Sequence, residues 1–384
     1  MIDTFSNSGW PRLHDGQKRV LFEILVHGPQ SRVELASRLG LSRTSLTRLA
    51  RELVEVGFVE EGEMLPSAAR GRPREMLRLR PGSAHFAGIK LTGDALYAVA
   101  TDLSAQVVGK REYVLGSREV PDVVELIGRV VNEMLADLEL PSAVGVSLAG
   151  DVRRVDGHEF VDRSVFLGWD DVPLAELVAA ECGLPGFVSN DVLGLTAAHH
   201  WFGAGVGLDS MALVGVGAGV RSGLVSGGRL VVGAHGTPGK VGHPRMRGTG
   251  ASCWRGHRDC VYSFVTTPAI EVNAGVEPGD YATAVRRAQL GDPRAMQAFD
   301  DAASALGIVV SQVINVFDPQ KVVITGEGTA MLDLAYARFE EALGDTCDRM
   351  PAEGVIERQP FDFSHYARGA AINALRGLTG GLAG

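Results

Sequence analysis

The chain has 384 residues, two to three times the length of a typical domain, which favours two or three globular units and excludes a single small fold. Its composition, 45% hydrophobic and 22% charged, is that of an ordinary globular protein, and its uninterrupted apolar runs fall short of the ~18 residues that span a bilayer. The four cysteines are scattered, and the first ten residues lack a secretory signal pattern. We therefore expect a cytoplasmic protein with reduced thiols and no membrane partner.

The net charge of −9 is unevenly distributed along the chain. Residues 1–82 hold 13 Arg and Lys against 10 Asp and Glu, a net charge of +3, so the remainder carries −12. A basic N-terminal segment on an acidic body is typical of a DNA-binding module joined to a domain that binds something else. The alternative is a chance excess of basic residues.

Residues 1–80 have the pattern of a winged helix-turn-helix domain. Apolar residues at helical spacing, flanked by Ser and Gly caps, predict three helices: 16–27, 31–39 and 42–56. Ser31 and Ser42 are placed to cap the second and third helices, and Gly40 ends the second. Alternating residues predict two short strands around a loop, the wing: 58–61 and 76–80. This order predicts binding to double-stranded DNA.

We assign the DNA contacts to the start of the third helix, the start of the second and the wing loop. The predicted residues are Arg32, Ser42, Arg43, Thr44, Ser45, Thr47, Arg48, Arg70 and Arg72. The wing loop cannot be helical because it contains Gly71 and Pro73, and its arginines suit a narrow minor groove. The alternative is a three-helix protein-interaction module with solvated charges.

Beyond a short linker at 81–84, residues 85–384 predict a mixed α/β body. The first set of elements has strands near 86–91, 96–103, 107–114 and 143–148, and a helix near 123–135. A second, similar set begins with strands at 210–216 and 220–225 and continues with a helix over 293–316, a strand at 322–325 and a helix from 329. Two β-rich starts, each followed by helices, predict two related lobes with a cleft between them.

Several motifs follow one another in the body: Leu167-Gly168-Trp169, Asn190-Asp191, the 217–223 loop, Gly233-Ala234-His235-Gly236, Gly242-His243, the 253–260 cysteine cluster and the 315–328 segment. In this combination the chain resembles the ROK family of repressors and sugar kinases, and in particular its winged-helix transcriptional regulators. The resemblance implies an actin-like, hexokinase-like two-lobed body over 85–384. It also implies a repressor of carbohydrate-related genes that binds a palindromic operator as a homodimer and senses a sugar or sugar derivative.

The phosphate loops depart from those of family kinases. Lys90 stands where those kinases have an Asp, and Asp94 would place a negative charge near the phosphates. In the second loop, Ala218 and Arg221 replace the usual Thr and Gly. Because phosphoryl transfer depends on positioning and charge stabilisation, we expect neither ATP binding nor kinase activity, and no catalytic residues. The alternatives are a sugar kinase with a DNA-binding head and a regulator that acts without a ligand.

The ligand site is also altered. The resemblance implies that Asn190, Asp191 and His243 contact a sugar, while the alternative for the first two is that they cap a helix. The two positions of sugar-binding Glu are Lys240 and Tyr262 here. We therefore include Lys240 among the ligand residues and expect weak binding of neutral hexoses, with an anionic ligand such as a sugar phosphate as an alternative.

The family zinc site is partly kept. His243, Cys253 and Cys260 match its ligands, whereas Arg255 stands at the position of a further Cys. Since a structural zinc site needs four closed N or S ligands, His257 is the nearby candidate for the fourth. The alternative is that zinc has been lost and the loop packs without it.

Overall fold

The computed structural model describes residues 10–65, 74–136, 138, 141–155, 157–246 and 252–379. The chain forms two compact units, the first from residues 1–207 and 363–384, the second from residues 208–362. The chain thus leaves the first unit once and returns to it with its last helix. Arg70 and Arg72 of the predicted wing lie outside the described residues.

The first unit begins with the predicted winged helix. Its elements are α1 Asp15–His27, β1 Gln30–Ser31, α2 Arg32–Leu39, α3 Arg43–Val56, β2 Val59–Leu65 and β3 Arg74–Leu79, with the strands in the order β1-β3-β2. Ser31 begins α2 in a reciprocal capping box with Glu34, and Gly40 ends it in the left-handed conformation. Ser42 caps α3 by accepting a hydrogen bond from the Ser45 N–H at 3.1 Å. The helix boundaries therefore follow the capping signals in the sequence.

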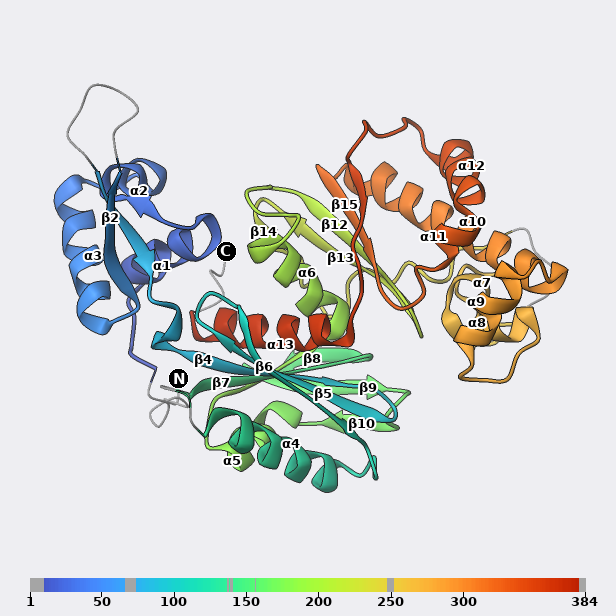
Figure 1. The fold of residues 1–384 in the computed structure, drawn as a ribbon, viewed down its shortest axis with the longest axis horizontal. Helices are drawn as coiled ribbons and strands as arrows, with labels where there is room; N and C mark the ends of the chain where they lie inside the picture. The colour runs from blue at the N-terminus through green and yellow to red at the C-terminus, as the bar shows by residue number, and fades with distance from the viewer. Residues whose placement is uncertain are drawn as a thin grey trace. The chain divides into compact units, whose positions relative to one another are not determined.

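The remainder of the first unit is an α/β lobe (Figure 1). Its elements are η1 Pro81–Ser83, β4 His85–Leu91, β5 Ala95–Asp102, β6 Val107–Val114, α4 Val120–Leu135, β7 Pro141–Leu148, β8 Asp151–Val155, β9 His158–Ser164, β10 Trp169–Val172, α5 Leu174–Cys182, β11 Gly186–Asn190, α6 Asp191–Phe202 and α13 Phe363–Leu378. The main sheet has the order β11-β7-β4-β5-β6, and β8, β9 and β10 form a small antiparallel sheet. Helix α13 lies on one face of the main sheet, with α4 and α5 on the other. Gly88 of β4 and Gly145 of β7 permit this packing, since a Cβ at either would overlap the α13 backbone.

Aromatic side chains join the winged helix to this lobe. Trp10 packs against Phe58 of the winged helix and Phe86 of β4, with ring centroids 4.6 and 5.8 Å away. Phe22 of α1 packs edge-on against Trp201 of α6, with centroids 4.9 Å apart. These rings belong to one apolar cluster shared by both parts, so the winged helix and the lobe have a common core.

The second unit repeats the architecture of the first lobe. It contains β12 Met211–Val216, β13 Val220–Ser226, β14 Arg229–Leu230, α7 Tyr262–Val265, α8 Thr267–Ala274, α9 Tyr281–Gln289, α10 Pro293–Phe317, β15 Lys321–Thr325, α11 Met331–Leu334, α12 Tyr336–Thr346 and β16 Ile356–Arg358. Its sheet has the order β14-β13-β12-β15-β16. Helix α10 has the length and composition of a membrane-spanning helix, but it packs in the core of this unit, with 56% of its most apolar window buried.

The two main sheets share one topology. In each, three consecutive strands form an antiparallel meander, and two later strands add in parallel beside the first strand of that meander. This repeat confirms the prediction of a winged helix followed by two related α/β lobes. The helix predicted from residue 329 differs in detail, because a turn and the short α11 precede α12.

Candidate functional sites

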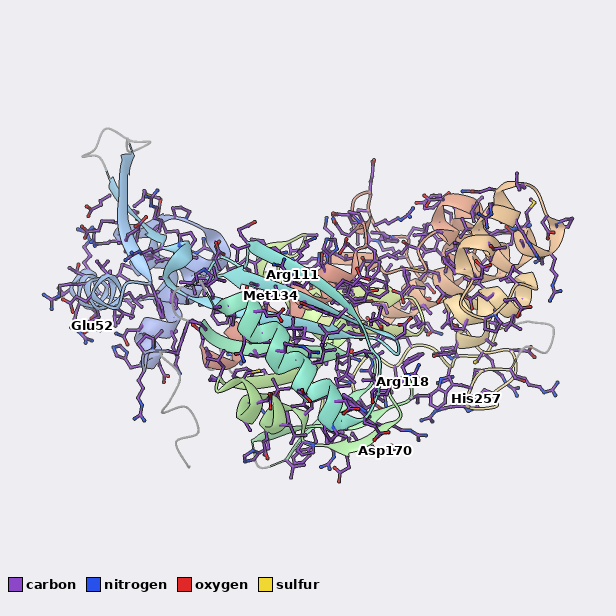
Figure 2. The ribbon with its side chains drawn as sticks, turned by 60° about the horizontal axis from the view of Figure 1, so that its bottom comes forward. Glu52, Arg111, Arg118, Met134, Asp170 and His257 are labelled. Carbon is purple, nitrogen blue, oxygen red and sulfur yellow. The ribbon has the colours of Figure 1, made fainter. Side chains whose placement is uncertain are left out.

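Helix α3 has one buried and one exposed face. Leu46, Leu49, Ala50 and Leu53 are buried against the rest of the winged helix. The predicted DNA-contacting residues of its first turns are exposed or half-buried: Ser42, Arg43, Thr44, Ser45, Thr47 and Arg48. Arg48 donates to the carboxylate of Glu52, one turn later, at 3.0 Å (Glu52 is labelled in Figure 2). The first half of α3 therefore presents hydroxyl and guanidinium groups on its outer side.

Arg32 is already engaged within the winged helix. Its guanidinium forms ion pairs with Glu61 of β2 and Glu75 of β3, and these bonds raise its pKa against the opposing effect of burial. Arg32 therefore ties the start of α2 to both strands of the wing, a role that the sequence did not indicate.

Lys90 and Asp191 form a buried ion pair in the first unit. The Lys90 ammonium contacts Asp191 Oδ2 and lies 4.7 Å from the centroid of the Tyr366 ring. The side chains are only 4% and 11% exposed. The second Asp191 oxygen accepts from the Val192 N–H at 2.9 Å. The carboxylate that the resemblance assigns to a ligand thus has intramolecular partners on both oxygens.

Asn190 acts as the N-cap of α6. Its Oδ1 accepts from the N–H groups of Val192 and Leu193 at 3.0 and 3.4 Å, and its Nδ2 donates to the Gly150 carbonyl at 2.9 Å. The capping alternative considered for this residue is therefore present, which leaves ligand contact as an additional role to be tested.

The two loops read from the sequence as phosphate loops are shorter than expected. Lys90 lies in β4 and Arg221 in β13, so neither side chain belongs to a turn. The first turn is closed by Thr92, whose hydroxyl donates to Asp94 Oδ1 at 2.8 Å. The second turn is Gly217-Ala218-Gly219, between β12 and β13. Ala218 N–H donates to Glu327 Oε1 at 2.9 Å, a contact with a residue that the sequence reasoning missed.

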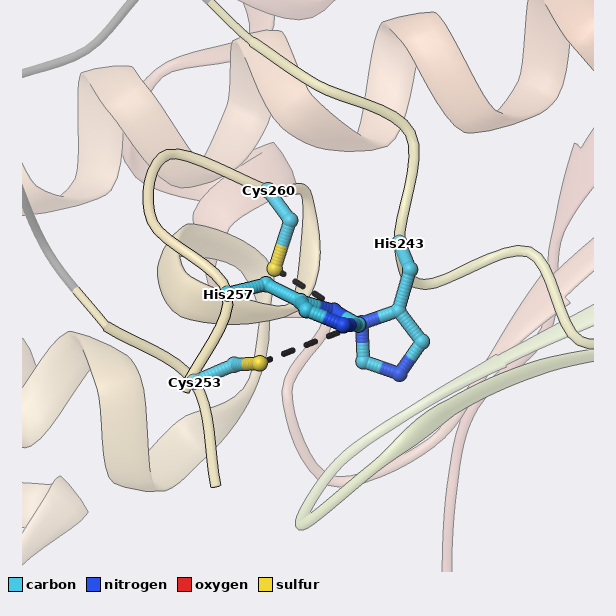
Figure 3. A group of neighbouring side chains, drawn as sticks. All are labelled: His243, Cys253, His257 and Cys260. Atoms are coloured by element: carbon cyan, nitrogen blue, oxygen red, sulfur yellow. Dashed lines mark hydrogen bonds between the residues drawn. The ribbon is translucent and has the colours of Figure 1, made fainter. Parts of the chain in front are cut away.

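Four predicted metal ligands meet in the second unit (Figure 3). His243, Cys253, His257 and Cys260 place one ligand atom each within 4.8 Å of all the others. His243 Nδ1 lies 3.3 Å from His257 Nδ1, 3.7 Å from Cys260 Sγ and 3.9 Å from Cys253 Sγ. A tetrahedral zinc ion with ordinary bond lengths holds its ligand atoms about 3.3–3.8 Å apart, and the three distances from His243 Nδ1 lie in or close to this range, whereas the full group spans up to 4.8 Å.

The charge state of His243 also suits a metal. Burial, followed by the nearby His257 and Arg255, lowers the pKa of His243, which keeps the imidazole neutral and able to coordinate. Arg255 lies with its guanidinium carbon 5.0 Å from the centroid of the Trp254 ring. The Arg255 guanidinium therefore makes a cation–π contact with the Trp254 indole.

Tyr262, at a position where the resemblance implies a sugar-binding Glu, joins two features of the second unit. Its ring stacks on His243 with centroids 5.7 Å apart, and its hydroxyl donates to the Ala218 carbonyl at 3.1 Å. Burial, followed by the Cys253 thiol, raises the pKa of Tyr262 to about 12. Lys240, the other replaced position, is exposed and follows Gly239, whose carbonyl accepts from the Ser222 N–H.

Comparison with known protein families also separates an N-terminal winged helix from the body of the chain. The pattern of the ROK family matches residues 86–375, and that of the MarR family matches residues 12–71. The DNA-binding transcriptional dual regulator NagC of Escherichia coli K12 is 27% identical over 320 residues, 79% of this chain and 78% of that protein. A putative xylose repressor of Caldicellulosiruptor sp. Rt8B.4 is 26% identical over 336 residues, 82% of this chain and 84% of its own.

Solved structures show the same fold. A ROK family transcriptional regulator, described as a homologue of the E. coli MLC protein, superposes with a TM-score of 0.78 at 24% identity, covering 96% of both chains. A ROK family glucokinase from Streptomyces griseus, solved with glucose and AMPPNP, has a TM-score of 0.65 at 22% identity and covers 76% of this chain and 100% of its own. With the family pattern spanning most of its length, and a MarR-type winged helix before it, the chain belongs to the ROK family.

Proposed function

We propose that this protein is a DNA-binding transcriptional regulator that represses carbohydrate-related genes in the cytoplasm. The observation that carries the proposal is the outer side of α3, where Arg43, Thr44, Thr47 and Arg48 are exposed on a capped helix of a MarR-type winged helix. Such a helix enters the major groove with its N-terminal residues toward the base edges. The similarity to NagC and to xylose repressors supports the same role.

The test is a gel shift on duplexes that the wild-type protein selects from a random pool. Arg43→Ala and Arg48→Ala should each weaken binding by about 1–3 kcal/mol and relax base preference, as expected for a lost base contact. Arg338→Ala is the matched control, because Arg338 is similarly exposed and also pairs with a Glu on its own helix, α12. If the α3 variants bind like the control variant, the recognition helix is placed wrongly.

The absence of kinase activity is part of the proposal. A family kinase uses the Asp of the Asn-Asp pair to take the proton from the attacked hydroxyl, whereas Asp191 here is bound to the buried Lys90 ammonium. We therefore expect no turnover in an ATP-coupled assay over a panel of hexoses. Turnover of any hexose would favour the alternative, a sugar kinase with a DNA-binding head.

We propose that the protein acts as a homodimer whose two winged helices bind a palindromic operator. The names of its relatives point to a sugar or sugar derivative as effector. Asn190, Asp191, Lys240 and His243 are the residues proposed to contact it. Because the Asp191 carboxylate is already paired with the Lys90 ammonium, we expect a ligand other than an ordinary neutral hexose.

We also propose that His243, Cys253, His257 and Cys260 hold a structural zinc ion, with His257 replacing the Cys that Arg255 displaces. Purified protein should then contain about one zinc per chain by elemental analysis, and Cys260→Ser should lose it with a lower Tm. His257→Ala should lose zinc to a chelator that leaves the wild type loaded, whereas His235→Ala, at an exposed His, should not. Metal-free wild-type protein would show that the site is vestigial.

A further inference from the structure

The glycine turn between β12 and β13 has a side chain in contact with it. Glu327 Oε1 accepts from the Ala218 N–H at 2.9 Å. A Cβ on Gly217 would overlap all three carboxylate atoms of Glu327, so the carboxylate lies over the position that a side chain at 217 would take. Gly217 is not in the left-handed region, so a side chain at 217 is opposed by the carboxylate and not by the backbone conformation.

The segment that carries Glu327 is held against the same strand. Glycines flank Glu327 on both sides, directly after β15. Gly326 has φ +123°, and a Cβ there would overlap the Val216 carbonyl. The Gly328 N–H donates to that same carbonyl at 2.9 Å. The backbone on both sides of Glu327 is therefore fixed at the end of β12, which delivers the carboxylate to the turn.

An outward N–H group in a glycine turn can bind an anion such as a phosphate group. In this turn the Gly217 N–H donates to the Gly219 carbonyl at 2.8 Å, whereas the Ala218 N–H points out of the turn to Glu327. We propose that the Glu327 carboxylate occupies the anion-binding position of the 217–219 turn. It stabilises the turn and prevents a phosphate group of a bound ligand from taking that position. This inference rests on the proposed function and deepens it, since it gives a physical reason in the second unit for the expectation that the protein binds no nucleotide. The carboxylate and a phosphate oxygen would compete for the same Ala218 N–H.

The neighbouring residues agree with a carboxylate at this place. The Thr267 N–H donates to the Gly217 carbonyl at 2.9 Å, and the Tyr262 hydroxyl donates to the Ala218 carbonyl. The carbonyl side of the turn is thus satisfied by donors, while the Ala218 N–H faces Glu327. The Tyr281 hydroxyl donates to the Gly328 carbonyl at 3.0 Å and packs beside the same segment.

A double-mutant cycle tests the occupancy of the turn. Gly217→Ala should lower the Tm of the second unit by about 5 °C, because the carboxylate must move. In the Glu327→Ala background the same change should have little effect. Gly219→Ala is the matched control, because a Cβ there meets only the Tyr262 hydroxyl, at 3.8 Å. Equal losses for Gly217→Ala in both backgrounds would overturn the proposal.

Calorimetry with inorganic pyrophosphate tests the exclusion. Glu327→Ala should bind pyrophosphate at least about tenfold more tightly than the wild type, whereas Glu327→Gln, which still fills the turn, should resemble the wild type. Equal binding to the wild type and to Glu327→Ala, or none to either, would overturn the exclusion. If Gly217→Ala lowers the Tm equally in both backgrounds and the wild type does not turn over ATP, this inference alone is refuted. If the wild type turns over ATP with a hexose, the proposed function is refuted.

Discussion

Breaking the Lys90–Asp191 pair should destabilise the first unit strongly. Both side chains are nearly buried, so removing one leaves a charge that is poorly solvated. Loss of one partner of a buried pair costs about 3–5 kcal/mol, because the uncompensated charge remains. Lys90→Met should fall at the lower end of this range, since Asp191 keeps its hydrogen bond from the Val192 N–H. For a unit of this size, about 3 kcal/mol corresponds to a loss of roughly 6–12 °C in Tm.

The double variant separates the pair from general packing. Lys90→Met with Asp191→Asn removes both charges, so its cost should be clearly smaller than the sum of the two single costs, with a coupling of about 2 kcal/mol or more. High salt should change none of these values much, because buried charges are screened little.

Tryptophan fluorescence in a Trp254→Phe background provides the assay. Trp254 is half-exposed in the second unit, whereas Trp10, Trp169 and Trp201 all belong to the first, so the remaining signal follows that unit alone. A Lys90→Met variant that melts within about 2 °C of its parent, or single costs that simply add, would refute the reasoning.

Three further outcomes are expected. Glucose at millimolar concentration should neither raise the Tm nor release DNA, because Asp191 is bound to an ammonium group, and micromolar binding by calorimetry would contradict this. Burial raises the pKa of Glu159 against the hydrogen bond from the Val188 N–H, so the folded state binds its proton more readily than the unfolded state and loses stability as pH rises above about 4.5. The Tm of Glu159→Gln relative to the wild type should therefore increase with pH over that window, and a constant difference would contradict it. Trp201→Ala should destabilise the first unit by about 3–5 kcal/mol through lost contacts with Phe22, and a loss below about 1 kcal/mol would show that the rings do not share a core.

The elements of the winged helix could be predicted from sequence because their signals are local. Ser31 and Ser42 cap helices through residues three positions away, and Gly40 ends a helix by its own backbone conformation. The two related lobes could also be predicted from the sequence, because each lobe begins with strands of alternating apolar residues. The small sheet β8-β9-β10 was missed, since each of its strands has only one or two buried residues and so gives a weak apolar pattern.

The contacts of the candidate sites depend on pairs that are distant in sequence. Lys90 was recognised as out of place in a phosphate loop, but its partner Asp191 lies 101 positions later. Arg32 was assigned to phosphates, whereas its carboxylate partners are 29 and 43 positions away. Glu327 had one sequence signal that was not used, a charged residue between two glycines directly after a buried strand. The residues of the metal cluster were predicted from the resemblance to the family zinc site, and all four lie within 18 residues of one another in the sequence.

Helix α6 connects two places that have been described separately. Its first residue is Asp191, which holds Lys90, and its last turn carries Trp201, which packs on Phe22 of the winged helix. A 12-residue α-helix is about 18 Å long and is stiff along its axis, because its backbone hydrogen bonds run parallel to that axis. A displacement of Asp191 along this axis would therefore bear on the contact between Trp201 and Phe22 of α1. Because α6 follows β11 directly and packs against α13, such a displacement would also act on the main sheet.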